Sequence, residues 1–191
     1  MPRQVSAFEQ QLISLIKPLN TAKYTADCRW DRLEDNFANL GRDYGGLEMN
    51  PDFQRGHEWT REQQQFFIEN CLRGIVPSSG FLLQFNCPQW NDDPSGSDLP
   101  PGLQCVDGLQ RYTAINEYLK GNVKPFGLTA QELAPTSFGP SRFYMKIAIH
   151  GFTRRVDLLE HYLAFNAGGT PHSAGEIARV RSLLEEAKKA S

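Results

Sequence analysis

The residues best suited to chemistry lie in the segment VDGLQR, residues 106–111. A strand pattern ends at Asp107 and Gly108, and a helical pattern follows at once. The first turn of such a helix directs free backbone N–H groups and the positive end of its dipole outward, which suits it to bind phosphate. Gly108 would let an anion approach the backbone, Gln110 could donate an amide hydrogen bond, and Arg111 offers a charged fork that matches phosphate oxygens.

Asp107 has two roles open to it in this segment. Its carboxylate could cap the helix, or it could help hold a cation such as Mg²⁺ beside bound phosphates. Helix N-caps favour aspartate in any case, so a plain cap followed by a surface arginine explains the same five residues. The segment alone does not decide between a ligand site and an ordinary helix start.

A second group of polar residues precedes a capped helix in NPDFQRGHEW, residues 50–59. Five of them fall within seven positions: Asp52, Gln54, Arg55, His57 and Glu58. Carboxylate and imidazole groups could perform general acid or base chemistry, or ligate a metal. Connecting loops are also polar simply because they face solvent, so a solvated turn with Phe53 and Trp59 as apolar anchors is the alternative.

The third group is FNAGGTPHSAGE, residues 165–176. Two glycines soon after Asn166 allow a sharp turn, and Ser173 with Glu176 forms a capping-box pattern for a following helix. Asn166 could brace the phosphate turn or contact a base or ribose. The same residues also make an ordinary helix start that needs no ligand.

Hydrophobic spacing and turn residues predict the elements that position these groups. We expect strands over residues 24–30, 81–86, 103–108 and 144–149, and a loop over 88–102. Thr60 with Gln63 predicts a capped helix from Arg61 to Leu72, with Phe66 among its inward residues. The other helices are expected over residues 5–16, 31–40 (ended by Gly41), 109–119, 156–165 and 174–189.

The composition fits one ordinary globular domain. The chain has 191 residues, 40% of them hydrophobic, and a formal charge of −2, so it lacks the basic field of an avid nucleic-acid binder, although a local basic patch stays open. No apolar run approaches the roughly 18 residues of a membrane span, and we read no signal peptide, so we expect a cytoplasmic protein. Four widely spaced cysteines predict buried free thiols.

In their order and spacing, three segments resemble the DGQQR-motif family, the N-terminal domain of GmrSD-type restriction systems, also called domain of unknown function 262. They are NPDFQRGHEWTREQQQFFIENCLRGIVP, QCVDGLQRYTAINEYLKG and LAFNAGGTPHSAGEI. The resemblance covers roughly residues 27–185. It implies an α+β fold like the ParB N-terminal and sulfiredoxin domains, with a small mixed sheet, flanking helices and a strand-to-helix phosphate turn. We expect one such domain over residues 1–191, with 1–26 as an N-terminal helical extension.

The resemblance also assigns residues. Its PxxQR segment falls on Pro51, Gln54 and Arg55, its DGQQR motif on Asp107 to Arg111, and its third motif on Asn166 and Gly169. It implies catalytic roles for Arg55, Asp107, Gln110 and Arg111, nucleotide binding by Gln54, Arg55, Gly108, Arg111 and Asn166, and metal binding by Asp107. Two positions depart from the family: Leu109 replaces the first glutamine of DGQQR, and His57 replaces a usual aromatic residue.

These assignments lead us to expect a domain that binds a nucleoside triphosphate with Mg²⁺, possesses slow NTPase activity, and controls DNA cleavage by a nuclease partner. A metal-dependent nuclease using Asp52, His57, Glu58 and Asp107 is the enzymatic alternative. A non-enzymatic regulator, or a phage-encoded decoy that binds a defence complex or DNA, is the second alternative. The resemblance implies a bacterial source, or a phage protein in its host's cytoplasm. The sequence has no HNH-like cluster.

Overall fold

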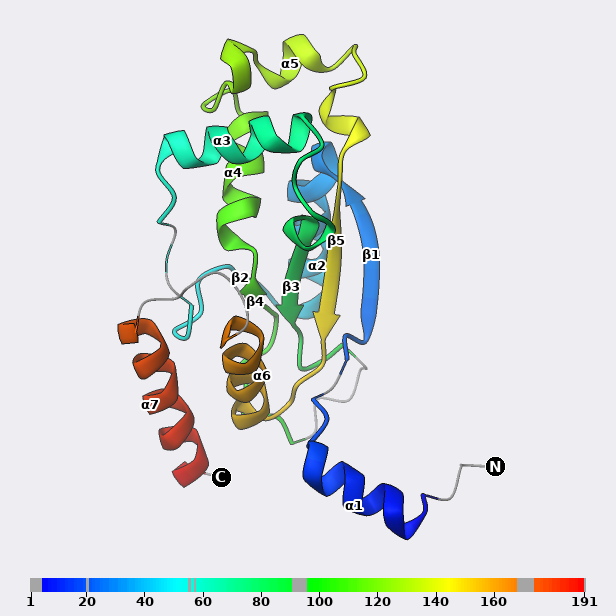
Figure 1. The fold of residues 1–191 in the computed structure, drawn as a ribbon, viewed down its shortest axis with the longest axis vertical. Helices are drawn as coiled ribbons and strands as arrows, with labels where there is room; N and C mark the ends of the chain where they lie inside the picture. Colours follow the sequence, from blue (N-terminus) through cyan, green and yellow to red (C-terminus); the bar gives the residue numbers. More distant parts are fainter. Residues whose placement is uncertain are drawn as a thin grey trace.

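The computed structural model describes residues 5–19, 21–54, 56, 58–90, 96–167 and 174–190. In this part of the chain, helices surround a five-stranded mixed sheet (Figure 1), as expected for the α+β class. The strands are β1 (Tyr24–Arg29), β2 (Leu47–Glu48), β3 (Leu82–Asn86), β4 (Leu103–Asp107) and β5 (Tyr144–His150). Their order is β1-β5-β3-β4-β2, with β1–β5 and β3–β4 antiparallel and β3–β5 and β2–β4 parallel.

Seven α-helices accompany the sheet in the described residues. They are α1 (Ala7–Ile16), α2 (Leu33–Tyr44), α3 (Arg61–Leu72), α4 (Leu109–Leu119), α5 (Ala130–Leu133), α6 (Arg155–Ala167) and α7 (Ala174–Ala190). The predicted bounds of α3 and α4 are confirmed. The capping box of α3 is also confirmed, because Thr60 Oγ1 accepts from the Gln63 N–H and the Gln63 side chain accepts from the Thr60 N–H. The short elements β2 and α5 were not predicted.

Helix α2 does not end at Gly41, as the sequence pattern predicted. It continues to Tyr44, and Gly45, with φ 90°, provides the left-handed C-cap. Gly41 is buried, and a Cβ added there would lie 3.1 Å from Leu47 Cβ. Glycine at 41 is therefore explained by the close approach of α2 to β2 rather than by helix termination.

The apolar side chains form two cores on opposite sides of the sheet. Alternate residues of a strand face opposite sides, so Cys105 enters the larger core while Val106 enters the smaller one. The larger core joins the sheet to α2, α3 and α4, whereas the smaller one joins it to α6 and α7. The end of β4 thus lies between both cores.

Four polar side chains of the central strands are buried on the face opposite the larger core: Gln84, Asn86, Gln104 and His150. Each of the four makes at least one side-chain hydrogen bond. Asn86 exchanges two hydrogen bonds with the backbone of Phe152, and Gln104 donates to Glu48 (3.0 Å). Polar and apolar residues therefore alternate in β3 because its apolar side chains enter the larger core, whereas its polar side chains face the other side of the sheet.

Helix α1 forms as predicted, with Ser6 as its N-cap, but none of its residues is buried. Phe8 is 68% exposed and Leu15 79% exposed. Figure 1 shows α1 standing apart from the sheet near the N-terminus. The strand predicted over residues 24–30 is confirmed as β1, and its residues 24–26 pair with β5, although we had counted them within the N-terminal extension.

All four cysteines are free and buried, which confirms the prediction from their spacing. Burial raises the pKa of the Cys71 thiol to about 12 and also raises that of Cys105. These thiols therefore stay protonated at neutral pH. In the part of the chain that the structure describes, no helix is long and apolar enough to cross a membrane.

Candidate functional site

The expected strand-to-helix turn is present at the end of β4. Gly108 is the N-terminal cap residue of α4, with φ 103°, and no side chain in the described ranges caps this helix. Asp107 therefore does not serve as a helix cap, which was one of its two expected roles. The first N–H groups of an α-helix have no partner within the helix itself, and such groups can bind an anion.

The need for glycine at 108 comes from packing against β3. A Cβ at this position would lie 2.5 Å from Leu83 Cδ2 and 3.3 Å from the carbonyl oxygen of Leu82. The positive φ adds backbone strain for any other residue. The missing side chain would thus project toward the sheet, so the fold itself requires this glycine.

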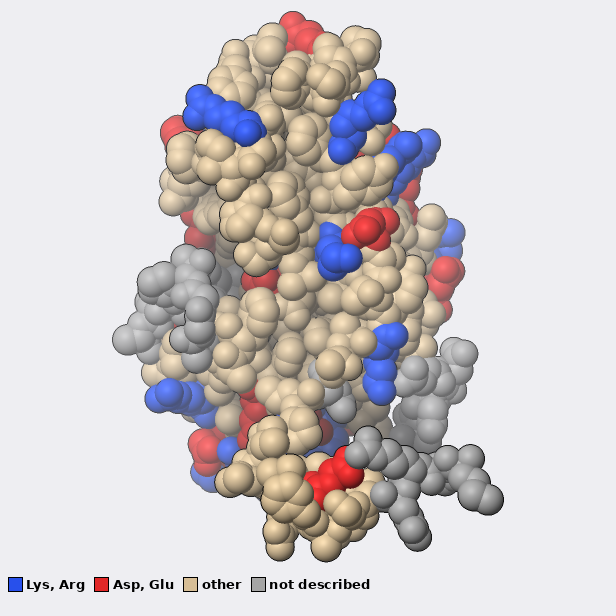
Figure 2. Space-filling model, turned by 45° about the vertical axis from the view of Figure 1, so that its right-hand side comes forward, with Lys and Arg blue, Asp and Glu red and all other residues tan. Residues whose placement is uncertain are grey.

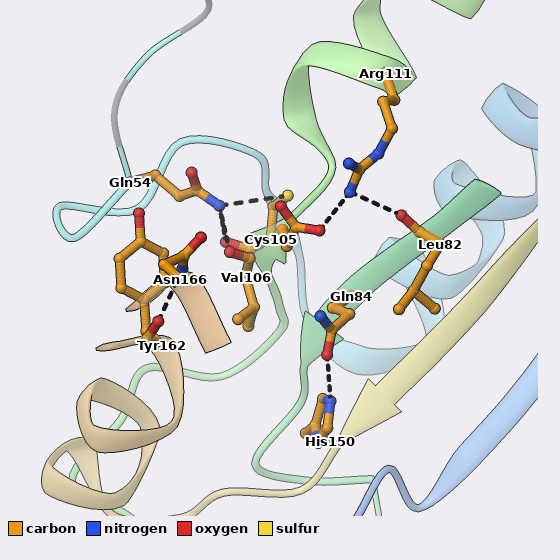
Figure 3. Close-up of polar contacts among 10 residues, drawn as sticks. Gln54, Leu82, Gln84, Cys105, Val106, Arg111, His150, Tyr162 and Asn166 are labelled. Atoms are coloured by element: carbon orange, nitrogen blue, oxygen red, sulfur yellow. Dashed lines mark hydrogen bonds and ion pairs between the residues drawn. The ribbon is translucent and has the colours of Figure 1, made fainter. Parts of the chain in front are cut away.

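Arg111 and Asp107 form an ion pair one helical turn apart, beside the start of α4. Arg111 Nη2 donates to Asp107 Oδ2 and to the carbonyl of Leu82 (3.0 Å) (Figure 3). The two side chains are 21% and 24% exposed. Arg111 Nε is buried and has no hydrogen-bond partner in the described residues, which leaves one donor of the fork unused.

The Gln54 side chain binds the turn formed by residues 51–54, called the PxxQ turn below, to β4. Its Nε2 donates to the carbonyls of Cys105 (3.2 Å) and Val106 (2.7 Å), and the residue is only 9% exposed. Its backbone N–H closes a turn onto Pro51 (2.9 Å). The Gln54 side chain is therefore bound to the carbonyl of Val106, the residue directly before Asp107, and Figure 3 shows the contact between Gln54 and Val106.

The Gln110 side chain binds the C-terminal part of the segment NPDFQRGHEW. Its Oε1 accepts from the N–H groups of Glu58 and Trp59 (both 3.0 Å), and its Nε2 donates to the carbonyl of Gly56 (2.9 Å). Both ends of the amide are engaged with protein, so Gln110 holds the backbone of Gly56, Glu58 and Trp59. Arg55 and His57, two further predicted site residues, lie outside the described residues.

The acidic candidates for a metal centre do not gather in the described ranges. Asp52 pairs with Arg155 of α6, at 2.6 Å between Oδ2 and Nη2, and Asp107 pairs with Arg111. No group of three or more His, Cys, Asp or Glu residues there could hold a metal ion.

Asn166 lies in the last turn of α6 and donates from Nδ2 to the carbonyl of Tyr162 (2.8 Å). The Tyr162 ring packs edge-on against Phe53 of the PxxQ turn, with 5.3 Å between ring centroids. Helix α6, which carries Asn166, therefore contacts the PxxQ turn through this aromatic pair. Gly169 and Ser173 fall outside the described residues.

A histidine pair that the sequence did not single out lies beneath the site. His150 Nε2 bonds Gln84 Oε1 (3.1 Å), and its ring lies 4.5 Å from that of His161. Burial, together with the nearby His150, lowers the pKa of His161 to about 4. His161 is therefore neutral in the folded protein at neutral pH.

The His161 pair predicts a loss of stability in mild acid. An unfolded histidine binds a proton near pH 6.5, whereas folded His161 does so only near pH 4. Between these values the unfolded state holds the extra proton, so the free energy of unfolding falls as pH drops and levels off below about 4. Urea unfolding between pH 7 and 4 should show a smaller decline in His161→Phe than in wild type; equal declines would contradict this assignment.

An apolar groove runs along the outer side of α3. Its volume is about 560 Å³, and its apolar lining includes Trp59, Phe66, Phe67 and Val76. Phe66 was predicted to point inward but is 63% exposed, because it lines this groove instead of the core. Trp59, whose backbone N–H donates to the Gln110 side chain, is one of the lining residues.

The family model for the N-terminal domain of the GmrSD restriction endonuclease matches residues 34–168, more than half of the chain. The chain therefore belongs to this family, which relates it to restriction endonucleases and to defence against phage. The match includes the Asp107–Arg111 turn, the PxxQ turn and Asn166, and leaves out α1 and α7. No curated protein and no solved structure matches the chain.

Proposed function

We propose that this chain binds a nucleoside triphosphate at the Asp107–Arg111 turn and thereby controls a restriction nuclease. The observation that carries the proposal is the arginine fork beside an uncapped helix start, with one buried guanidinium donor unused. First-turn N–H groups and a guanidinium are the donors that proteins commonly use for phosphate oxygens. Membership of the restriction-related family supports the nuclease connection.

The two glutamines have a positioning role in this proposal. Gln54 holds the PxxQ turn on β4, and Gln110 of α4 holds the backbone of Gly56, Glu58 and Trp59. Arg55 follows Gln54 directly in the sequence, and we propose that it pairs with the outer phosphate. Asn166 would contact the ribose or base from the neighbouring helix α6.

Asp107 is the residue that would hold Mg²⁺. This ion commonly takes one or two protein carboxylates together with phosphate oxygens, so a single aspartate beside a phosphate turn fits it. When bound, Mg²⁺ neutralises phosphate charge. The Asp107 carboxylate now pairs with Arg111, and we propose that bound phosphate takes over that arginine.

The leucine at position 109, where the family motif has glutamine, does not conflict with slow hydrolysis of the nucleotide in this proposal. The residue is 9% exposed and belongs to the larger core, so it faces away from the open side of the turn. The departure from DGQQR at this position therefore changes core packing rather than the groups around the proposed phosphates.

The charge distribution favours a compact anion over a long polyanion as ligand. On the face drawn in Figure 2, Lys and Arg lie dispersed, with Asp and Glu among them, and form no continuous basic patch. Several of the cations in the described ranges are paired with acids, such as Lys146 with Asp27 (3.2 Å). Avid DNA binding usually requires clustered basic residues.

A thermal-shift screen tests the proposed function. The purified chain is heated with ATP, GTP, CTP or UTP, each with and without Mg²⁺, because a ligand of the native state raises its apparent stability. We expect one nucleotide to raise the melting temperature by several degrees, and phosphate release is then measured with that nucleotide. No shift with any nucleotide at millimolar concentration would contradict the proposal.

A further inference from the structure

The turn that carries Gln54 is also held from the side of the C-terminal helix. Arg179 of α7 donates from Nη1 to the carbonyl of Asp52 (3.0 Å) and from Nη2 to the carbonyl of Gln54 (2.7 Å). A guanidinium is a rigid planar fork, so two bonds to carbonyls two residues apart fix the shape of the turn as well as its place.

Phe53, the residue between Asp52 and Gln54, adds an apolar contact between the turn and α7. Phe53 is 1% exposed and lies in the smaller core with Val180 and Leu184 of α7. Val180 directly follows Arg179 and is also 1% exposed. Helix α7 therefore contacts the turn through a buried ring and through a pair of charged hydrogen bonds.

Through the Gln54 side chain, the turn at residues 52–54 also contacts the end of β4, next to the Asp107–Arg111 turn. The Gln54 side chain donates to the carbonyl of Val106, directly before Asp107. Its main chain is bound by Arg179, and Asp52 is bound by Arg155 of α6. A displacement of α7 must therefore move residues 52–54, and with them the side chain that rests on the end of β4.

We infer that Arg179 is a positioning residue of the nucleotide site and that α7 responds to its occupancy. This inference rests on the proposed nucleotide binding. Coupling between two parts of a protein is reciprocal. A ligand that fixes residues 52–54 should therefore also stabilise α7, and loss of the Arg179 side chain should weaken nucleotide binding. Arg179 lies outside residues 34–168, the part of the chain that the family model matches.

The test compares Arg179→Ala with Arg181→Ala on the same helix. Arg181 is exposed and makes no hydrogen bond or ion pair within the described residues, so its replacement removes a positive charge alone. We expect Arg179→Ala to raise the Kd for the nucleotide found in the screen by about tenfold, since two charge-assisted bonds are lost. The Kd of Arg179→Lys should lie between those of wild type and Arg179→Ala, because an ammonium group cannot make both bonds of the guanidinium. Arg181→Ala should bind the nucleotide with the wild-type Kd.

Amide hydrogen exchange supplies a readout that a purely structural role would not change. Nucleotide should slow exchange in peptides from residues 174–190 of the wild type and Arg181→Ala, but not of Arg179→Ala. Equal Kd values for the two alanine variants would overturn the inference and leave the proposed function standing. A wild-type chain that binds no nucleotide would instead contradict the proposed function itself, and this inference with it. Arg179→Lys carries the comparison if the alanine variant does not fold.

Discussion

Gly108→Ala is expected to destabilise the fold strongly, lowering the free energy of unfolding by about 2–4 kcal/mol. Two costs add. The residue has φ 103°, where an L side chain is strained, and the new Cβ would lie 2.5 Å from Leu83 Cδ2. Leu83 is fully buried, so its side chain has little room to move. Urea unfolding of the variant and the wild type measures the difference.

Gly121→Ala is the matched control for this substitution. Gly121 also has a positive φ, 79°, but nothing lies within 4 Å of an added Cβ. It should therefore show only the strain of the left-handed backbone, about 1–2 kcal/mol. If Gly108→Ala is no more destabilising than Gly121→Ala, the packing of the turn against β3 is not what requires glycine at 108.

Arg111→Ala is expected to weaken nucleotide binding by at least about a hundredfold, because charge-assisted bonds to phosphate contribute roughly 1.5–3 kcal/mol each. The variant also loses the ties to Asp107 and Leu82, so its melting temperature should be measured beside its Kd. Titration calorimetry with the nucleotide chosen by the screen gives the affinity.

Two further variants define what Arg111 contributes. Arg111→Lys keeps the charge but loses the planar fork, so its affinity should lie between the alanine variant and the wild type. Arg61→Ala removes an exposed arginine from the start of α3 and should bind normally. Wild-type affinity in a folded Arg111→Ala would mean that this arginine does not contact the phosphates.

The sequence predicted well where the determinants are local. The capping box of α3 involves residues three positions apart. The change from strand to helix at Gly108 is determined by the six consecutive residues 106–111. Both were predicted with their correct positions. The order of the three motifs was also enough to indicate the family to which the chain belongs.

Predictions failed where the structure of a residue depends on packing between segments that are distant in the sequence. Gly41 is a turn signal by type, but its place against Leu47 makes it a residue of the helix interior. Phe66 fits the apolar pattern of α3, yet it lines an open groove, because spacing along a helix does not reveal which apolar residues find a partner. The short strand β2 has two residues and depends on its pairing with β4.

The site shows the same division. Candidate residues could be named from the motifs, but their partners could not, since Gln54 and Gln110 bond to backbone more than fifty residues away. Arg179 contacts the turn across 125 residues of sequence and has no local motif. Only the folded arrangement reveals that Gln54 and Gln110 hold the segment NPDFQRGHEW against β4 and α4.

The most direct test of the central claim is to follow backbone amide resonances of the ¹⁵N-labelled chain while the selected nucleotide is added. Phosphate at the start of α4 should shift the N–H signals of residues 108–111 more than those of most other residues, because these groups would become hydrogen-bond donors to the ligand. The signal of Gly121, just beyond the C-terminal end of α4, should change little. Nucleotide binding that leaves residues 108–111 unchanged would contradict the claim that this turn is the phosphate site.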